Sequence, residues 1–290
     1  MKNVLFATTA LVLTAGVASA EVTFSGKAEA GVVSTAAGAT AAIADGAAES
    51  MEVYSGIDID IAVSGATDSG MTISTSVDMG AGEIADVADK ELDTQGATLG
   101  APTIAITSGA TTVSLANQGI DDLYDDTQNG DIGIATSFGD ATVALTLDTD
   151  AAAGEAGLSY SVGYTMSGVS LSITGTDADD NGDSAMKIAG SYTMGDITVG
   201  LVSDDKGAGD TVNDLTLTYK AGAATVTLSA DDNDDWEAAL SYTAGGMKVN
   251  FSTDEESAWE ADVAYDLGGA TAFAATDSNE TMIAGINFSF

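Results

Sequence analysis

The chain contains no cysteine, histidine or arginine and has one proline among its 290 residues. Without cysteine, neither disulfides nor thiolate metal sites can hold the fold together. The absence of histidine also removes histidine-based catalytic triads and most transition-metal sites. An enzyme would depend on unusual carboxylate or lysine chemistry, so we expect a protein that is not an enzyme and requires no cofactor.

Positive charge is scarce, because 7 lysines stand against 45 acidic residues and the net charge is -38 at pH 7. This charge excludes nucleic acid as a partner, since phosphate binding needs a basic face. A disordered acidic chain would carry a similar charge. The hydrophobic content of 45 % and the 34 glycines in regular positions indicate a folded protein instead.

A long apolar stretch occurs only at the start of the sequence. Lys2 precedes the stretch from Val4 to Val17, and Ala18–Ala20 (ASA) has the small-x-small form of a cleavage site. We therefore expect an exported protein with a signal peptide at 1–20 and a single mature domain at 21–290. A transmembrane anchor is the alternative, but the stretch is short of the roughly 20 residues that a spanning helix needs. No later run reaches that length, which excludes helical membrane proteins.

Period-two alternation of apolar and polar residues dominates the second half of the chain. In Leu158–Met166 the even positions are apolar, and the pattern resumes in Val169–Ile173 after a Ser-Gly turn. The same hairpin recurs at Met186–Met194 with Ile197–Leu201, at Leu215–Lys220 with Val226–Leu228, at Trp236–Tyr242 with Met247–Phe251, and at Trp259–Tyr265 with Ala270–Ala274. One structural unit is repeated.

Each unit places an aromatic residue shortly before a tight turn that contains glycine, whereas the other connections are longer and rich in Asp, Gly and Asn. These aromatics recur about every 25 residues, at Phe138, Tyr164, Tyr192, Tyr219, Tyr242 and Tyr265. Short turns at one end and aromatics near them are typical of a transmembrane β-barrel. A soluble secreted solenoid or sandwich is the alternative. The barrel is favoured because closure leaves no edge strand.

Charges distinguish the two faces of the strands. Leu240 lies on the apolar side of its strand, and Glu237 and Ser241 point the other way. A charge on a lipid-facing surface costs about 2–4 kcal/mol at mid-bilayer, so the charged face must line water. The predicted pore-lining residues are Lys27, Lys187, Lys220, Lys248, Glu237, Glu260 and Asp262.

The final strand places Phe288 and Phe290 on its apolar side, where we expect them to serve barrel closure and assembly. At this point the sequence resembles the Gram-negative general porins, particularly those of the alphaproteobacterial Rhodobacter group. The resemblance spans nearly the whole chain and rests on Glu21–Gly26 (EVTFSG), Ser64–Gly70 (SGATDSG), Tyr265–Gly269 (YDLGG) and the terminal phenylalanine.

The resemblance implies an antiparallel barrel, typically sixteen-stranded and trimeric, that sits among outer-membrane lipid and lipopolysaccharide. It further implies passive diffusion of small hydrophilic solutes and ions, with one loop folded inward to narrow the pore. The alternation itself gives eighteen strands, with early ones near 21–34, 51–65, 70–80, 97–107 and 111–118. The predicted fold is therefore an all-β, up-and-down antiparallel barrel of 16–18 strands with short periplasmic turns and longer acidic outer loops.

The acidic segment 117–131 is the predicted pore constriction, because its place after the fifth strand resembles that of the inward-folded loop. Its carboxylates are Asp121, Asp122, Asp125, Asp126 and Asp131. A solvated surface loop is the other interpretation. Porins of this kind oppose the acidic loop with a basic cluster, often of arginine, and here the four lysines named above are the only candidates.

A second acidic cluster, at 177–183, resembles the start of a calcium-binding loop. Its potential ligands are Asp177, Asp179, Asn181 and Asp183, but Ile188 stands where the bidentate acid of an EF-hand is needed. A loose Ca²⁺ site and a solvated loop both remain open, and the solvated loop is favoured. The leading function is a cation-preferring diffusion pore. The alternative is an acidic, Ca²⁺-binding structural or adhesive surface protein, and an outer-membrane hydrolase would lack the expected histidine.

The assignment of faces predicts that neighbouring residues tolerate charge differently. Leu240→Arg should lower the free energy of unfolding by roughly 2–4 kcal/mol, whereas Ser241→Arg should fold normally because its side chain reaches water. Unfolding by denaturant in lipid vesicles measures both variants. Equal stability would show that the faces are assigned wrongly.

Overall fold

The computed structural model describes residues 20–35, 50–96, 102–125, 127–152, 155–179, 182–207, 209 and 211–290. The predicted signal peptide lies outside these ranges except for its last residue, Ala20. All regular elements in the described ranges are strands. No helix long and apolar enough to cross a membrane occurs in them.

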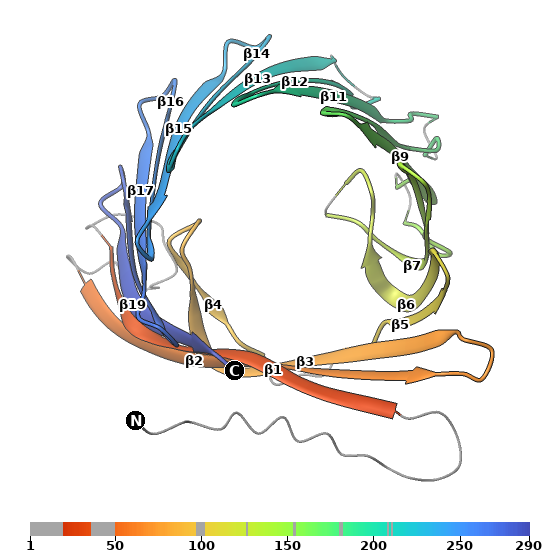
Figure 1. Ribbon diagram of the computed structural model, residues 1–290, viewed down its shortest axis with the longest axis horizontal. Coiled ribbons are helices and arrows are strands. Elements are labelled where there is room, and N and C mark those ends of the chain that lie inside the picture. Colours follow the sequence, from red (N-terminus) through yellow and green to blue (C-terminus); the bar gives the residue numbers. More distant parts are fainter. Residues whose placement is uncertain are drawn as a thin grey trace.

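Eighteen antiparallel strands form a closed barrel, which confirms the fold predicted from the alternation. Each strand pairs with its sequence neighbours, and β1 (Ala20–Thr35) pairs with both β2 (Ser50–Ala66) and β19 (Met282–Ser289). Figure 1 shows the resulting ring. The first half of the wall continues with β3 (Thr72–Asp86), β5 (Ile104–Ser108), β6 (Thr111–Asp121), β7 (Asn129–Phe138), β8 (Ala141–Leu147), β9 (Leu158–Met166) and β10 (Val169–Thr176). The second half adds β11 (Met186–Met194), β12 (Ile197–Asp205), β13 (Val212–Ala221), β14 (Ala224–Asp231), β15 (Trp236–Ala244), β16 (Met247–Asp254), β17 (Trp259–Asp266) and β18 (Thr271–Asp277).

Tight turns join the strands at one end of the barrel, and longer connections join them at the other. Between β9 and β10 the turn is Ser167-Gly168, where Gly168 adopts φ 84° in the left-handed region that glycine tolerates. The opposite connections include 148–157 and 177–185 and are rich in aspartate. This arrangement of short turns and longer acidic loops is the predicted one.

The barrel wall is apolar outside and polar inside. Alternate side chains of a strand point to opposite faces, and the apolar set is exposed although a soluble sheet would bury it. Leu240, for example, is 43 % exposed, whereas Glu237 pairs across the sheet with Ser229 and Asp254. Exposed apolar side chains include Met166, Leu171, Met194, Leu201, Tyr219, Leu228, Phe251, Ile286 and Phe288. Such a surface fits lipid, and the closed wall excludes the soluble sandwich.

The strand ladder between β1 and β19 ends in a reciprocal pair of backbone hydrogen bonds. The N–H groups of Gly26 and Phe290 each donate to the other's carbonyl oxygen over 3.0 Å. The Phe290 ring lies against Gly26, where an added Cβ would collide with the Asp58 carbonyl oxygen on β2 and would be 2.7 Å from the ring's Cζ. Phe288 packs nearby, with ring centroids 6.1 Å apart. Glycine at position 26 therefore makes room for the aromatic ring on the outer face.

The structure departs from the predicted early strands at two places. The strand expected near 70–80 extends to Asp86 in β3, and its last residues pair with β4 (Glu91–Thr94), which was not predicted. β4 pairs with β3 alone and lies inside the ring (Figure 1). The strand expected near 97–107 corresponds to β5, which begins only at Ile104; 102–103 are not in a strand, and 97–101 lie outside the described residues.

The seam contacts predict that Gly26→Ala and Phe290→Asp both lower the yield of folded barrel. The first places a methyl group against the Asp58 carbonyl oxygen and in the space of the ring, and the second removes the ring from the lipid-facing surface. Gly65→Ala is the matched control, because nothing lies within 4 Å of a Cβ there. Heat-dependent mobility of the folded barrel in detergent gels measures the yield. Normal folding of both seam variants would contradict this view of closure.

Candidate functional site

Polar side chains from neighbouring strands form continuous rows across the inner wall. On β16 and β17, the amide of Asn250 donates to both carboxylate oxygens of Asp262, over 3.1 and 2.9 Å. One row further, Ser252 pairs with Glu260. The register places Glu237, Glu260 and Asp262 on the inner face, because the alternate residues Leu240 and Val263 are exposed outside.

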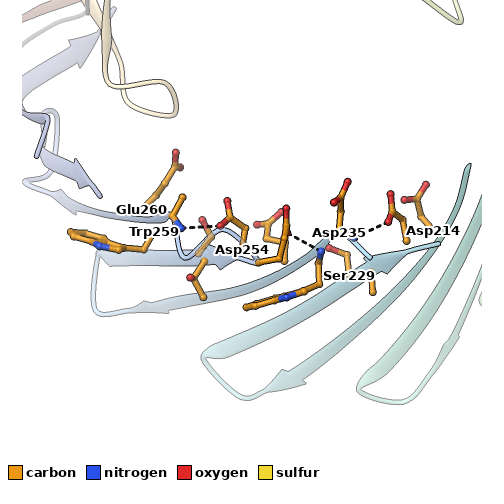
Figure 2. Close-up of a pocket in the computed structure, with 14 residues that line it drawn as sticks. Asp214, Ser229, Asp235, Asp254, Trp259 and Glu260 are labelled. Carbon is orange, nitrogen blue, oxygen red and sulfur yellow. Dashed lines mark hydrogen bonds between the residues drawn. The ribbon is translucent and has the colours of Figure 1, made fainter. Parts of the chain in front are cut away.

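The long-loop end of β13–β17 forms a hollow of about 450 Å³, here called the outer hollow. Figure 2 shows the carboxylates of Asp214, Asp235, Asp254 and Glu260 pointing to the same side of the sheet. Its acidic lining residues are Asp214, Asp231, Asp235, Glu237, Asp254, Glu255 and Glu260, and no lysine lines it. Repulsion by the Asp231 carboxylate, with smaller contributions from desolvation and Glu255, raises the pKa of Asp235.

The predicted pore-lining lysines do not gather into a basic cluster. Lys27 pairs with Glu29, Nζ to Oε2 2.6 Å, and Lys187 pairs with Asp204, Nζ to Oδ2 3.4 Å. Lys220 and Lys248 have no ion pair with the described residues and lie beside tight turns. The predicted lysines are therefore separate cations, and two of the four are already beside a carboxylate.

The acidic segment 117–131 bends into the ring between β6 and β7 (Figure 1). The backbone N–H of Leu123 donates to Ser159 Oγ over 3.0 Å, and Ser159 is fully buried. Further along, the Tyr124 hydroxyl donates to Asp204 Oδ1 over 2.7 Å. Lys187 Nζ lies 5.4 Å from the centre of the Tyr124 ring. These contacts fix the segment against the inner faces of β9, β11 and β12.

Several carboxylates of the acidic segment shape its own backbone. Asp122 Oδ1 accepts the N–H groups of Tyr124 and Asp125, over 2.8 and 2.9 Å. Hydrogen bonds from the side chain and backbone of Thr127 lower the pKa of Asp125. Burial and the hydrogen bond to Asp204 raise the pKa of Tyr124, so the hydroxyl keeps its proton.

The remaining predicted constriction residues have different positions. Asp121 ends β6, and its carbonyl oxygen accepts a hydrogen bond from Thr146 Oγ1 over 3.2 Å. Asp131 lies on β7. Its carboxylate accepts hydrogen bonds from the backbone N–H groups of Gln118 on β6 and of Thr149, which follows β8. Asp126 lies outside the described residues. The role of the five aspartates as a pore constriction remains a prediction.

Two of the residues predicted to bind Ca²⁺ use a carboxylate oxygen to accept a backbone hydrogen bond. Asp177 Oδ1 accepts the N–H of Leu158, and Asp179 Oδ1 accepts the N–H of Asp183. Asn181 lies outside the described residues. Among the residues that the structure describes, one trio of carboxylates has its oxygens within 4.8 Å of one another, and it is Asp131, Asp148 and Asp150. Gln118 Nε2 donates to the last two over 2.8 Å each, so an amide already sits among these acids.

A second segment folds into the lumen, and the alternation pattern did not predict it. The hairpin Glu83–Thr94, here called the inner hairpin, contains the end of β3 and all of β4. Its Ala85 N–H donates to Glu29 Oε1 over 2.7 Å, and its Lys90 Nζ lies 2.6 Å from Glu260 Oε2. The available signal was the pair of glycines at Gly80 and Gly82 within an otherwise regular alternation, since such a pair lets a strand bend away from its sheet.

A closed barrel with an apolar exterior, a charged lumen and two inward segments is the structure of a transmembrane channel protein. A sequence profile of the Gram-negative porins matches residues 7–276, and the chain belongs to this family. No curated protein sequence matches the chain.

Solved porin structures share the fold at low sequence identity. A mutant of Rh. blastica porin superimposes with a TM-score of 0.56 and 18 % identity, covering 93 % of this chain and 100 % of that one. OpdQ of Pseudomonas aeruginosa gives a TM-score of 0.57 and 10 % identity, covering 93 % and 98 %. Family and fold together make this protein an outer-membrane porin channel.

The contacts of Tyr124 predict how firmly the acidic segment is held. Tyr124→Phe keeps the ring beside Lys187 but loses the hydrogen bond to Asp204, which should contribute roughly 1.5–3 kcal/mol because its acceptor is charged. Exchange of the Leu123 amide hydrogen should then become about tenfold faster or more, because local opening costs less. Tyr265→Phe removes an exposed outer hydroxyl and is the control. Unchanged exchange at Leu123 would show that Tyr124 does not hold the segment.

Proposed function

We propose that this porin passes small hydrophilic solutes and ions by passive diffusion and prefers cations. The observation that carries the preference is the outer hollow, where seven carboxylates line one face of the lumen and Glu260 alone among them pairs with a described lysine, Lys90. The protein acts here without catalysis or a required cofactor. Its proposed partners are outer-membrane lipid, lipopolysaccharide and two further copies of the chain.

The physical basis of the preference is field focusing. Protein and lipid around the lumen have a low dielectric constant, so the field of fixed charges spreads along the aqueous path and enriches counter-ions there. Asp214 and Glu237 make no ion pair with any described lysine, so their charge acts on the water-filled space. Lys27, Lys90 and Lys187 are each beside a carboxylate, which reduces their effect on passing ions.

The acidic segment is the proposed constriction on the β9–β12 side. Its attachment through Leu123 and Tyr124 holds it in the lumen, and its carboxylates would add to the cation preference. Lys220 and Lys248 are proposed to line the pore near the tight turns. Export by the signal peptide at 1–20 belongs to the same proposal. The loop at 177–183 is proposed to be a solvated acidic loop, with loose binding of Ca²⁺ as the alternative.

Neutralising charges of the outer hollow should reduce the preference for cations. The double variant Asp214→Asn with Glu237→Gln should shift the zero-current potential in a salt gradient toward anions, since two unpaired lumen charges are lost. The control is Asp68→Asn with Glu280→Gln, which removes the same charge from a tight turn and an outer loop. The cation preference and the shift caused by the double variant should both shrink at high salt, because the screening length falls from about 30 Å at 0.01 M to about 3 Å at 1 M.

Planar-bilayer recording separates the parts of this proposal. Anion preference of the native channel at low salt would reject the cation-preferring pore. Equal shifts from the two double variants would retain the pore and reject the outer hollow as the origin of selectivity. A separate variant with Asp121, Asp122 and Asp125 changed to Asn tests the acidic segment, and an unchanged potential would exclude it from selectivity.

A further inference from the structure

The inner hairpin leaves the barrel wall at a defined point. β3 pairs with β2 as far as Gly82, whose φ is 77°, and the next residues pair with β4 instead. An added Cβ at Gly82 would collide with the carbonyl oxygen of Ser55, so glycine allows the close approach that the bend requires. Beyond this bend the chain crosses into the lumen, where Figure 1 shows β4 inside the ring.

A buried carboxylate anchors the base of the inner hairpin. Glu29 on β1 points into the lumen and is 4 % exposed. Its Oε1 accepts the Ala85 N–H and the Tyr54 hydroxyl over 2.7 and 3.0 Å, and its Oε2 lies 2.6 Å from Lys27 Nζ. Burying a carboxylate is costly unless such partners are present. The hairpin backbone therefore provides one of the bonds that make this burial possible.

An apolar cluster secures the body of the inner hairpin. The inner face of the barrel is polar elsewhere. Here Val33, Phe273 and Ile283 face inward and are buried. Ala85 of the hairpin belongs to this cluster, and Leu92 packs against it. Burial of apolar surface stabilises the docked position, and the covered strands are those on both sides of the seam.

An ion pair fixes the tip of the inner hairpin. Lys90 is 3 % exposed, and its Nζ lies 2.6 Å from Glu260 Oε2 on β17 and donates to the Ala88 carbonyl oxygen over 2.7 Å. Base, body and tip thus attach independently to β1, β18–β19 and β17. A segment with three attachments has a fixed position across the lumen.

We propose that the inner hairpin is a permanent inner wall that sets the upper size of solutes able to pass, and that Glu29 is its positioning residue. This inference rests on the proposed diffusion function and names an element that limits it. The hairpin covers the β17 to β2 side of the lumen, and its Val87, Ala88 and Lys90 also line a hollow of about 260 Å³ with inward residues of β14–β16. The acidic segment occupies the β9 to β12 side. The free path then runs between the two inward segments (Figure 1).

Two changes should widen the channel. Replacement of 84–93 by a short Gly-Ser linker should raise single-channel conductance by roughly 1.5-fold or more, because the open cross-section limits conduction. Larger polyethylene glycols should then enter the pore and reduce its current. Glu29→Ala should act in the same direction. Glu29→Gln keeps an oxygen that can accept both hydrogen bonds, so its conductance and size limit should stay near those of the native channel.

A third variant tests position in the intact barrel. Because the chain has no cysteine, Ala88→Cys introduces a single thiol at the exposed tip region of the hairpin. A bulky methanethiosulfonate reagent should lower the current of the open Ala88→Cys channel by roughly a third or more if the tip borders the ion path. Asn279→Cys, on an outer loop, is the matched control and should show little change.

The outcomes separate this inference from the proposed function. Absence of any channel in the native protein would reject the diffusion function itself. A conducting native channel with unchanged conductance and size limit after the linker replacement would overturn the role of the hairpin. If the replacement or Glu29→Ala prevents folding, an unaltered current after labelling of Ala88→Cys would overturn it instead. Widening by Glu29→Gln equal to that by Glu29→Ala would reject Glu29 as the positioning residue.

Discussion

The structure depends on one constraint, which is that backbone N–H and C=O groups inside a bilayer must find partners within the protein. Strands satisfy this condition only when the sheet has no open edge. The pairing of β1 with both β2 and β19 provides the closure, and every other strand of the wall is paired on both sides. Closure then decides the remaining properties, because a closed sheet has one face toward lipid and one toward its own interior.

The division between faces explains the unusual composition. Apolar residues are used outside, so the barrel has no central core, and the acidic residues are free to occupy the lumen and the long loops. The small apolar cluster around Ile283 is an exception that exists because the inner hairpin covers it. Where no segment covers the inner wall, as at the outer hollow, the inward side chains are carboxylates, Ser and Thr.

Local periodicity made most of the wall predictable. Strands from Leu158 to Asp277 follow a strict alternation with glycine-containing turns, and both features depend on residues close together in sequence. The count of eighteen followed from the same pattern. The inner hairpin could not be found in this way, because its direction depends on contacts of Ala85 and Lys90 with Glu29 and Glu260, which lie far away in the chain.

The candidate site was predictable in composition but not in arrangement. Alternation placed Glu237, Glu260 and Asp262 on the charged face of their strands, and the register agrees. It could not show that Glu260 pairs with Lys90 or that Lys187 lies beside Tyr124, because ion pairs between distant strands depend on how the barrel closes. The acidic segment was conspicuous for its charge, yet its attachment uses the uncharged Leu123 and Tyr124.

The seam has a consequence for the order in which the barrel folds. Lys27 pairs with Ser289, so nearly all of the wall lies between the two partners along the chain. Pairing between such distant segments must overcome a large loss of chain entropy and is slow compared with hairpin formation. The hairpins of β9–β18 can therefore form early, and the seam closes late. The cluster under the inner hairpin draws on strands from both sides of this seam, so its packing can be completed only after the two ends of the sheet have met.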